Sequence, residues 1–393
     1  MNEVAINILV TLLTSYIFPT AFAGDCGSNF KAKCTCGEMP YDGILQYVVN
    51  CTNAGFTNTN ILESMPNETQ ILIFSGNRID ELPWNVFGTI NKYYKLTVVD
   101  MSNNHIREIR GKAYHHVQNV KRLILDHNNL SISRDDDDVN HHHPRVFSNF
   151  INLEALHLTD AFADNSPPEL SEDLHDIFFQ SNLTKLRKLH LEQNEISTFK
   201  DRKVFCDLIN LNDLYLGDNW LQEINFDVKC LKKLRFLDLE RNKFEYLKPK
   251  DLKLLDELEE NSRMERSIDL IVDFKLNPFV CDCKIHQFHK WLNLTKVNVR
   301  EKEKLVCLKD GRNLERISQI QYDKCITKTK SDHTILLIFL LTALSIILVG
   351  LLSALAYLSR DKIRHAMFPV LDTMSKKVQY TTIKDDDCPE VHV

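Results

Sequence analysis

The sequence predicts an α/β solenoid, a stack of short parallel strands joined by irregular connections, followed by one membrane-spanning helix. The first observation is an apolar nine-residue pattern that recurs between residues 61 and 276, and the second is an uncharged stretch at residues 334–358. Of the 393 residues, 44% are hydrophobic and 26% are charged, with a net charge of −6. This composition is typical of a folded protein, and it argues against nucleic acid as a partner.

The chain begins with an apolar segment that predicts a signal peptide at residues 1–23. The segment runs from Val4 to Phe18, and the small residues Ala21 and Ala23 follow in the spacing that signal peptidase cleaves. Because no Lys or Arg precedes the apolar run, an uncleaved anchor remains an alternative.

Residues 334–358 are long enough to cross a hydrocarbon layer of about 30 Å as a tilted helix. Basic residues lie on both sides of this stretch, so their distribution alone does not orient it. A cleaved signal peptide orients the span, because it places the N-terminus outside the cell. Residues 359–393 then form a cytoplasmic tail. We therefore expect a type I single-pass protein of the plasma membrane.

Cysteines and glycosylation sequons agree with this topology. Ten of the eleven cysteines precede the span, where an even number in an oxidising compartment favours disulfides, and Cys388 lies alone in the tail. The Asn-x-Ser/Thr sequons also precede the span, at Asn50, Asn67, Asn129, Asn182 and Asn293. A disulfide at Cys51 would compete with glycosylation of Asn50.

The recurrent pattern is Leu-x-x-Leu-x-Leu-x-x-Asn, the signature of a leucine-rich repeat. Residues 186–194 read Leu-Arg-Lys-Leu-His-Leu-Glu-Gln-Asn, and residues 211–219 and 234–242 match as strictly. The units, 23 to 35 residues apart, end at Asn77, Asn104, Asn128, Ala161, Asn194, Asn219, Asn242 and Asn277. Because alternate strand residues point into the coil, we expect a leucine-rich-repeat horseshoe with a parallel sheet on its concave face.

The Asn at the end of each unit predicts a ladder of hydrogen bonds to buried backbone groups. An unpaired buried amide costs about 1–3 kcal/mol, so this residue type is favoured at the turn. Ala161 replaces the Asn in one unit, and we expect the ladder to be weaker there.

Cysteine-rich segments flank the repeats, as an array with two open apolar ends requires. Cys26, Cys34, Cys36 and Cys51 precede the repeats, and residues 277–283, Asn-Pro-Phe-Val-Cys-Asp-Cys, begin the segment that follows them. With these caps and one span, the chain resembles extracellular leucine-rich-repeat membrane proteins of the trophoblast glycoprotein and synaptic adhesion type.

The resemblance implies an N-terminal cap at 24–60, repeats at 61–276, a C-terminal cap at 277–326 and a juxtamembrane stalk at 327–333. It also implies four disulfides, which join Cys26 with Cys36, Cys34 with Cys51, Cys281 with Cys307 and Cys283 with Cys325. For Cys206 and Cys230, which precede adjacent strands, a bridge and two free thiols are both open. The charged residues 250–266 predict a helix, either on the convex side or across the concave edge.

The concave face is the expected ligand site, because curved solenoids usually bind there. Its candidate residues lie six or four positions before the end of a unit: Asp100, Arg122, His157, His190, Asp213, Tyr215, Phe236, Asp238 and Asp273. The C-terminal half is acidic around the aromatic pair Tyr215 and Phe236, a combination typical of interfaces. No sequon falls in these columns, so we expect no glycan on the face. Polar residues on a solvated sheet without a function remain the alternative.

No metal, cofactor or catalytic site is predicted. His157 and His190 lie on neighbouring strands about 5 Å apart, which suits a pH-sensitive contact or a metal, but the pattern supplies no third ligand. The Asp run at 135–138 and the His run at 141–143 are typical of a solvated loop. Because no G-x-S-x-G, H-E-x-x-H or Walker-type loop occurs, we do not expect an enzyme.

The tail is too short for a signalling domain, so any signal passes through partners. Tyr380 and Ile383 form Tyr-x-x-Ile, which resembles a clathrin-adaptor sorting signal and also an inhibitory phosphotyrosine motif, with chance as a third explanation. Val391 and Val393 at the end resemble a PDZ-domain ligand.

These features together predict a cell-surface receptor or adhesion molecule, neuronal or epithelial, that binds an extracellular or cell-surface protein. A co-receptor or decoy for a secreted ligand, such as a growth factor or a Wnt-type protein, is the second hypothesis. Innate recognition of microbial products is the third.

Overall fold

The computed structural model describes residues 22–23, 26–30, 32–131, 146–163, 167–266, 269–320, 323–360 and 362. Two compact units, Met1–Ile320 and Gln321–Val393, make up the chain. Several predictions fall outside the described residues: most of the signal peptide, the Asp and His runs within 135–143, and the tail motifs at Tyr380, Ile383, Val391 and Val393.

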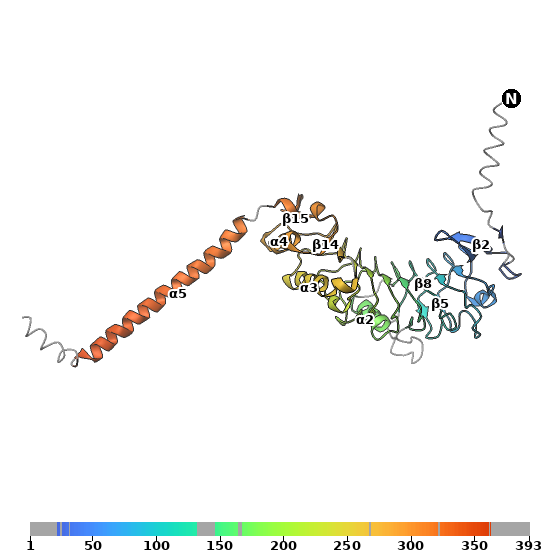
Figure 1. Cartoon of the computed structure of the whole chain (residues 1–393), viewed down its shortest axis with the longest axis horizontal. Helices are drawn as coiled ribbons and strands as arrows, with labels where there is room; N and C mark the ends of the chain where they lie inside the picture. Colours follow the sequence, from blue (N-terminus) through green and yellow to red (C-terminus); the bar gives the residue numbers. More distant parts are fainter. Residues whose placement is uncertain are drawn as a thin grey trace, which may run out of the picture. The chain divides into compact units, whose positions relative to one another are not determined.

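A twelve-stranded sheet runs along the first unit (Figure 1). Each of the eight repeats contributes one three-residue strand, and these strands pair in parallel. They are β4 (Ile71–Ile73), β6 (Val98–Asp100), β8 (Arg122–Ile124), β9 (Ala155–His157), β10 (Lys188–His190), β11 (Asp213–Tyr215), β12 (Phe236–Asp238) and β13 (Ile271–Asp273). The predicted leucine-rich-repeat solenoid with a parallel sheet is confirmed.

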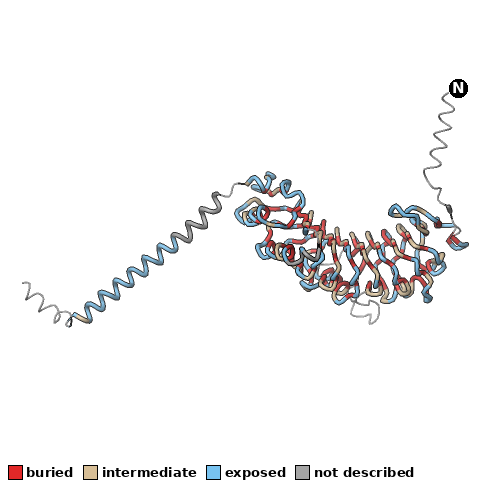
Figure 2. The backbone as a smooth tube through the Cα atoms, viewed as in Figure 1, coloured by how far each residue is buried: buried red, intermediate tan, exposed pale blue. Residues whose placement is uncertain are grey.

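Alternation along each strand separates the core from the concave face. The middle residue of the strands points into the coil and is fully buried in Leu72, Val99, Leu123, Leu156, Leu189, Leu214, Leu237 and Val272. Figure 2 shows buried segments that recur from coil to coil along the first unit, with exposed segments between them. Burial of a Leu side chain stabilises the fold by about 1.5–3 kcal/mol, so this column fixes the register of every repeat.

The asparagine ladder joins each repeat to the one before it. Asn219 Nδ2 donates to the carbonyl of Leu191 at 2.9 Å, and Asn242 Nδ2 donates to that of Leu216 at 2.8 Å. At Ala161 the side-chain link is missing, and the backbone N–H of Asn128 donates instead to the carbonyl of Asp160 at 3.2 Å. The ladder is thus interrupted at the unit that lacks Asn.

The N-terminal hairpin consists of β2 (Thr35–Tyr41) and β3 (Ile44–Asn50) and extends the sheet by pairing β3 with β4. Its turn residues Asp42 and Gly43 have φ angles of 50° and 78°, as the tight turn of a two-residue hairpin requires. Disulfides join Cys26 to Cys36 and Cys34 to Cys51, the pairs that the resemblance implies. The short strand β1 (Phe22–Ala23) belongs to the predicted signal peptide and would leave with it.

Helices and turns connect the strands on the other side of the coils. They comprise η1 (Asn60–Ser64), α2 (Pro167–Phe178), η2 (Val228–Cys230), α3 (Pro249–Arg266) and the small sheet of β5 (Glu81–Leu82) and β7 (Glu108–Ile109). Cys206 and Cys230 form a disulfide, which settles the alternative that the sequence left open. The charged segment at 250–266 is helical, and α3 packs against η2 rather than across the sheet.

The C-terminal region of the first unit closes the stack. It contains η3 (Cys283–Ile285), α4 (His286–Leu294), β14 (Asn298–Val299), η4 (Lys302–Lys304), β15 (Val306–Lys309), β16 (Asn313–Arg316) and η5 (Ile317–Gln319). Strand β14 pairs in parallel with β13 and ends the large sheet. Cys281 bonds to Cys307; Cys283 is also disulfide-bonded, while the side chain of its predicted partner Cys325 lies outside the described residues.

The second unit contains the helix α5 (Asp323–Leu358). Its segment Ile335–Leu358 has a mean hydropathy of 3.1 and is long and apolar enough to cross a membrane. The residues predicted as a stalk, 327–333, fall within the same helix. Together with the disulfides, this one apolar helix fits a single-pass membrane protein.

Candidate ligand-binding face

A row of four side-chain rings crosses the concave face from β9 to β12. The rings of His157 and His190 stack at 4.2 Å, and those of His190 and Tyr215 stack at 4.1 Å. Phe236 continues the row at 5.3 Å from Tyr215 with its ring tilted by 59°. The repeat brings these rings together because the strands pair in parallel and in the same register. Each ring belongs to the first or the third residue of its strand, and both positions point to the concave face.

The two histidines have different environments. Burial, and then the neighbouring His190, lowers the pKa of His157 to about 3, so its imidazole is neutral at physiological pH. His190 Nδ1 lies 3.0 Å from Glu192 Oε1. Among the described residues, no group of three or more His, Cys, Asp or Glu side chains is arranged to hold a metal ion.

Three predicted face residues, Asp213, Asp238 and Asp273, are buried instead of open to solvent, and cations hold the first and the last of them. Asp213 is 3% exposed, and Arg235 donates two hydrogen bonds to its carboxylate, at 2.7 and 2.9 Å. Asp273 is 1% exposed, with Lys275 Nζ at 3.4 Å and Arg300 Nη1 at 3.5 Å from its Oδ2. The repeat pattern could not reveal this burial because the cations come from neighbouring turns and from the segment after β14.

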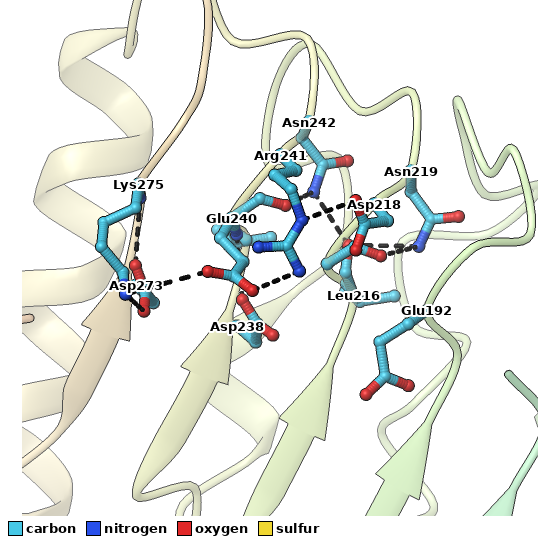
Figure 3. Close-up of polar contacts among 12 residues, drawn as sticks. Glu192, Leu216, Asp218, Asn219, Asp238, Glu240, Arg241, Asn242, Asp273 and Lys275 are labelled. Atoms are coloured by element: carbon cyan, nitrogen blue, oxygen red, sulfur yellow. Dashed lines mark hydrogen bonds and ion pairs between the residues drawn. The ribbon is translucent and has the colours of Figure 1, made fainter. Parts of the chain in front are cut away.

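Further ion pairs join carboxylates at the ends of the C-terminal strands (Figure 3). Arg241 lies between Asp218, at 2.6 Å, and Glu240, at 2.5 Å. Lys275 Nζ lies 3.9 Å from Glu240 Oε2 as well as beside Asp273. The acidic half of the face predicted from the sequence is therefore largely neutralised by its own cations.

Asp238 differs from these carboxylates. It is 8% exposed, and its Oδ1 accepts the backbone N–H of Glu240 at 2.9 Å. Among the described side chains, no Lys, Arg or His lies within ion-pair distance of it. Burial is the main reason that its pKa rises to about 6, and the nearby carboxylates Glu240 and Asp273 raise the pKa further.

A cavity of about 570 Å³ opens beside Asp238. We call it the Asp238 cavity; its lining comprises Tyr215, Phe236, Asp238, Ile271, Asn298, Arg300 and Glu301. The first four residues belong to the repeat strands, and the last three to the segment that begins with β14. Sequence reasoning found Tyr215, Phe236 and Asp238 and did not name Ile271. It also missed Asn298, Arg300 and Glu301, because nothing in the repeat pattern indicates that β14 extends the sheet.

The tip of the N-terminal hairpin contacts the first three repeat strands of the face. Asp42 at its tip pairs with Arg122 of β8 at 2.7 Å, although 80 residues separate the two in sequence. Tyr41 packs against the buried cluster of Val48, Ile71 and Val98. Asp100 and Arg122, both predicted to bind ligand, thus lie next to the hairpin, and Arg122 already has a carboxylate partner.

The structure adds one sequon to the sheet of the concave face, outside the eight repeat strands. Asn50 at the end of β3 aligns with Ile73, so this sequon stands in the middle column of the face, one strand before the first repeat. Its Oδ1 accepts the Thr52 hydroxyl at 2.6 Å. The sequons at Asn67, Asn129, Asn182 and Asn293 lie outside the strands, so the C-terminal half of the face carries none.

Comparisons with known proteins agree with this architecture. The leucine rich repeat family model matches residues 184–244. Trophoblast glycoprotein of Macaca fascicularis is 25% identical over 296 residues, which cover 70% of this chain and 62% of that protein. The transforming growth factor beta activator LRRC33 of Danio rerio is 26% identical over 199 residues, or 51% of this chain and 26% of that protein. Lumican of Mus musculus is 32% identical over 149 residues, or 37% of this chain and 38% of that protein.

Among solved structures, that of human trophoblast glycoprotein matches with a TM-score of 0.56 and 23% identity over 70% of this chain and 92% of that one. The chain thus shares the fold of that structure, while it spans less than two thirds of the length of each curated relative named above. The chain therefore carries a leucine-rich-repeat domain with disulfide-bonded ends and resembles trophoblast glycoprotein in sequence and fold.

Proposed function

We propose that the chain is a cell-surface protein that binds an extracellular or cell-surface protein through the C-terminal half of its concave face. The observation that carries this proposal is the row of rings from His157 to Phe236, which ends at the Asp238 cavity. Aromatic side chains in a polar surround are typical anchors of protein interfaces. The tip of the N-terminal hairpin contacts strands β4, β6 and β8, whereas neither its ion pair nor its apolar cluster reaches β10 to β13, which favours the C-terminal half for a partner.

The proposal includes the topology expected from the sequence. A signal peptide at residues 1–23, an exterior ectodomain with caps at 24–60 and 277–326, and a cytoplasmic tail at 359–393 are supported by the disulfides of the first unit, since such bonds persist in oxidising compartments. PDZ-domain and clathrin-adaptor partners of the tail remain proposals from its sequence motifs. We infer that the protein is not an enzyme; the relatives named above carry no enzyme names.

A second candidate is a co-receptor or decoy that modulates a secreted ligand. It is favoured by the names of two similar proteins, a transforming growth factor beta activator and a trophoblast glycoprotein also called Wnt-activated inhibitory factor 1. Deletion of residues 363–393 separates the candidates: a co-receptor keeps its effect on ligand response, whereas an adhesion receptor that signals through tail partners loses it.

The test of the proposal is a binding screen of the full chain, displayed on cells, against arrayed secreted and cell-surface proteins. The variant Tyr215→Ala with Phe236→Ala removes the anchors, and we expect it to weaken binding of a partner by about tenfold or more. Trp84→Ala with Tyr94→Ala removes two exposed aromatics outside the concave strands and serves as the matched control. A partner that binds the face variant as well as the unaltered chain would place the site elsewhere.

A further inference from the structure

Asp238 is a buried carboxylate for which the fold supplies no cation. Two buried carboxylates nearby are paired: Asp273, which aligns with Asp238 in the sheet, is held by Lys275 with Arg300, and Asp213 on the adjacent strand β11 is held by Arg235. An unpaired buried charge is costly, so proteins seldom keep one without a use. The missing partner at Asp238 is therefore informative about a ligand.

The surroundings of Asp238 fit a cationic side chain. Tyr215 and Phe236 line the Asp238 cavity with aromatic surface, and Ile271 adds apolar surface. A cation near the face of an aromatic ring is attracted by the negative charge density of that face, and apolar walls accommodate the methylene groups of a long side chain. The volume of about 570 Å³ admits such a side chain from the open face.

The charges around the cavity also favour a cation over an anion. The carboxylates Glu240, Asp273 and Glu192 all act on Asp238. Arg300, the lining cation, lies 3.5 Å from Asp273 and so is already directed at a carboxylate. An anionic ligand would meet Asp238 and Glu301 in the same cavity without a free cation to balance them.

We propose that the Asp238 cavity is a subsite for one Lys or Arg side chain of the protein ligand, with Asp238 as its ion-pair partner and Tyr215 and Phe236 as its walls. The inference rests on the proposed function and names the chemistry of that site. A charge-assisted hydrogen bond to Asp238 in this partly desolvated cavity is stronger than an exposed surface ion pair. It gives the site a preference for basic over uncharged side chains, which the rings alone cannot provide.

The experiment uses the full chain in neutral phosphatidylcholine nanodiscs and short peptides as probes. The probes are acetyl-Gly-Arg-Gly-amide and acetyl-Gly-Lys-Gly-amide, with citrulline and acetyl-lysine in place of the basic residue as uncharged isosteres. Saturation-transfer NMR reports which peptide protons approach the protein, and empty nanodiscs give the blank. We expect transfer to the side-chain methylenes of the basic peptides and transfer about fivefold weaker for the isosteres.

Two variants assign the signal to this cavity. Asp238→Asn keeps the acceptor for the N–H of Glu240 and removes the charge, so we expect the difference between each basic peptide and its isostere to disappear. Asp201→Asn is the matched control, because Asp201 lies outside the concave strands and its Oδ1 likewise accepts the N–H of the residue two positions later, Lys203, at 2.9 Å. Phe236→Leu keeps apolar bulk without the ring and should weaken the basic peptides about two- to fivefold. Circular dichroism verifies that each variant is folded.

Three results would overturn the inference: equal transfer to the basic peptides and their isosteres, unchanged transfer with Asp238→Asn, or preferential binding of acetyl-Gly-Glu-Gly-amide that is lost with Arg300→Gln. The outcome is separable from that of the proposed function. A protein partner that requires Tyr215 and Phe236 but binds Asp238→Asn normally would leave the binding face intact and refute the basic subsite. Peptide binding at Asp238 without any partner from the screen would support the subsite and count against the proposed function.

Discussion

At the scale of single residues, identical side chains on one face have different roles because their neighbours differ. Asp213, Asp238 and Asp273 follow from one periodic pattern, and the sequence places all three on the same face. Their burial could not be predicted, since it depends on Arg235 and Arg300, which lie outside the columns of the repeat. Nor could the lack of a cation at Asp238, because this is a property of the folded surroundings.

This difference predicts an effect of Asp238 on stability that depends on pH. Its pKa is raised from 3.8 to about 6 in the folded state, so the folded protein binds this proton more tightly than the unfolded chain. The free energy of unfolding therefore falls as pH rises from about 4 to about 6. The loss of stability caused by the ionised carboxylate is at most about 3 kcal/mol, and it is fully present above that range.

We expect Asp238→Asn to raise the free energy of unfolding at neutral pH by about 1–3 kcal/mol and to have little effect at about pH 4. Urea unfolding of the full chain in nanodiscs, followed by circular dichroism at both pH values, measures the difference. A loss of stability at neutral pH, or a gain of the same size at both values, would show that the carboxylate is not the source of the cost.

At the scale of elements, the asparagine ladder provides a second prediction. The N–H of Ala161 donates to Asn194 Oδ1 at 2.9 Å, as the N–H of Asn194 donates to Asn219 Oδ1 at 3.0 Å, so its backbone already has the geometry of the other units. We expect Ala161→Asn to restore the link to the preceding repeat and to stabilise the fold by about 1 kcal/mol. The rise in unfolding midpoint measures this, with Ala163→Asn, outside the ladder, as the control. A lower midpoint would mean that the buried site lacks room for the amide.

The N-terminal hairpin is an element whose place on the face the sequence did not predict. Its alternation and its Asp-Gly turn are local signals, but the contact of Asp42 with Arg122 spans 80 residues and leaves no trace in a periodic pattern. An exposed ion pair of this kind contributes about 0–1 kcal/mol. We expect Asp42→Asn to speed hydrogen exchange in the hairpin a few-fold and to leave the unfolding midpoint nearly unchanged.

Exchange of the amides at 41–44, measured by mass spectrometry, tests this prediction. Glu81→Gln removes a similar ion pair with Arg110, at 2.7 Å, and is expected to leave hairpin exchange unaltered. If Asp42→Asn has no effect on the hairpin, the apolar cluster of Val48, Ile71 and Val98 suffices to hold it in place.

At the scale of the whole molecule, the repeats and the disulfide-bonded ends were expected, but the way in which the ends extend the sheet was not. The eight strands and their register follow from apolar residues at fixed spacing, because one misplaced residue would turn a buried Leu outward. The sheet nevertheless continues into β3 and β14, which lie outside that spacing. For this reason Asn50 joined the face unexpectedly, and Asn298 and Arg300 were missed at the cavity.

The orientation of the chain in the membrane provides the last prediction. If residues 24–333 are outside the cell, the exposed sequons at Asn67, Asn182 and Asn293 are glycosylated, and an epitope placed after residue 24 is stained on intact cells. An epitope at the C-terminus is then stained only after permeabilisation. Glycosidase treatment and single Asn→Gln variants measure each site, and we expect Asn50→Gln to cause no shift, because Cys51 lies in a disulfide. Staining of the C-terminus on intact cells would reverse the proposed topology and, with it, the compartment in which the concave face meets a ligand.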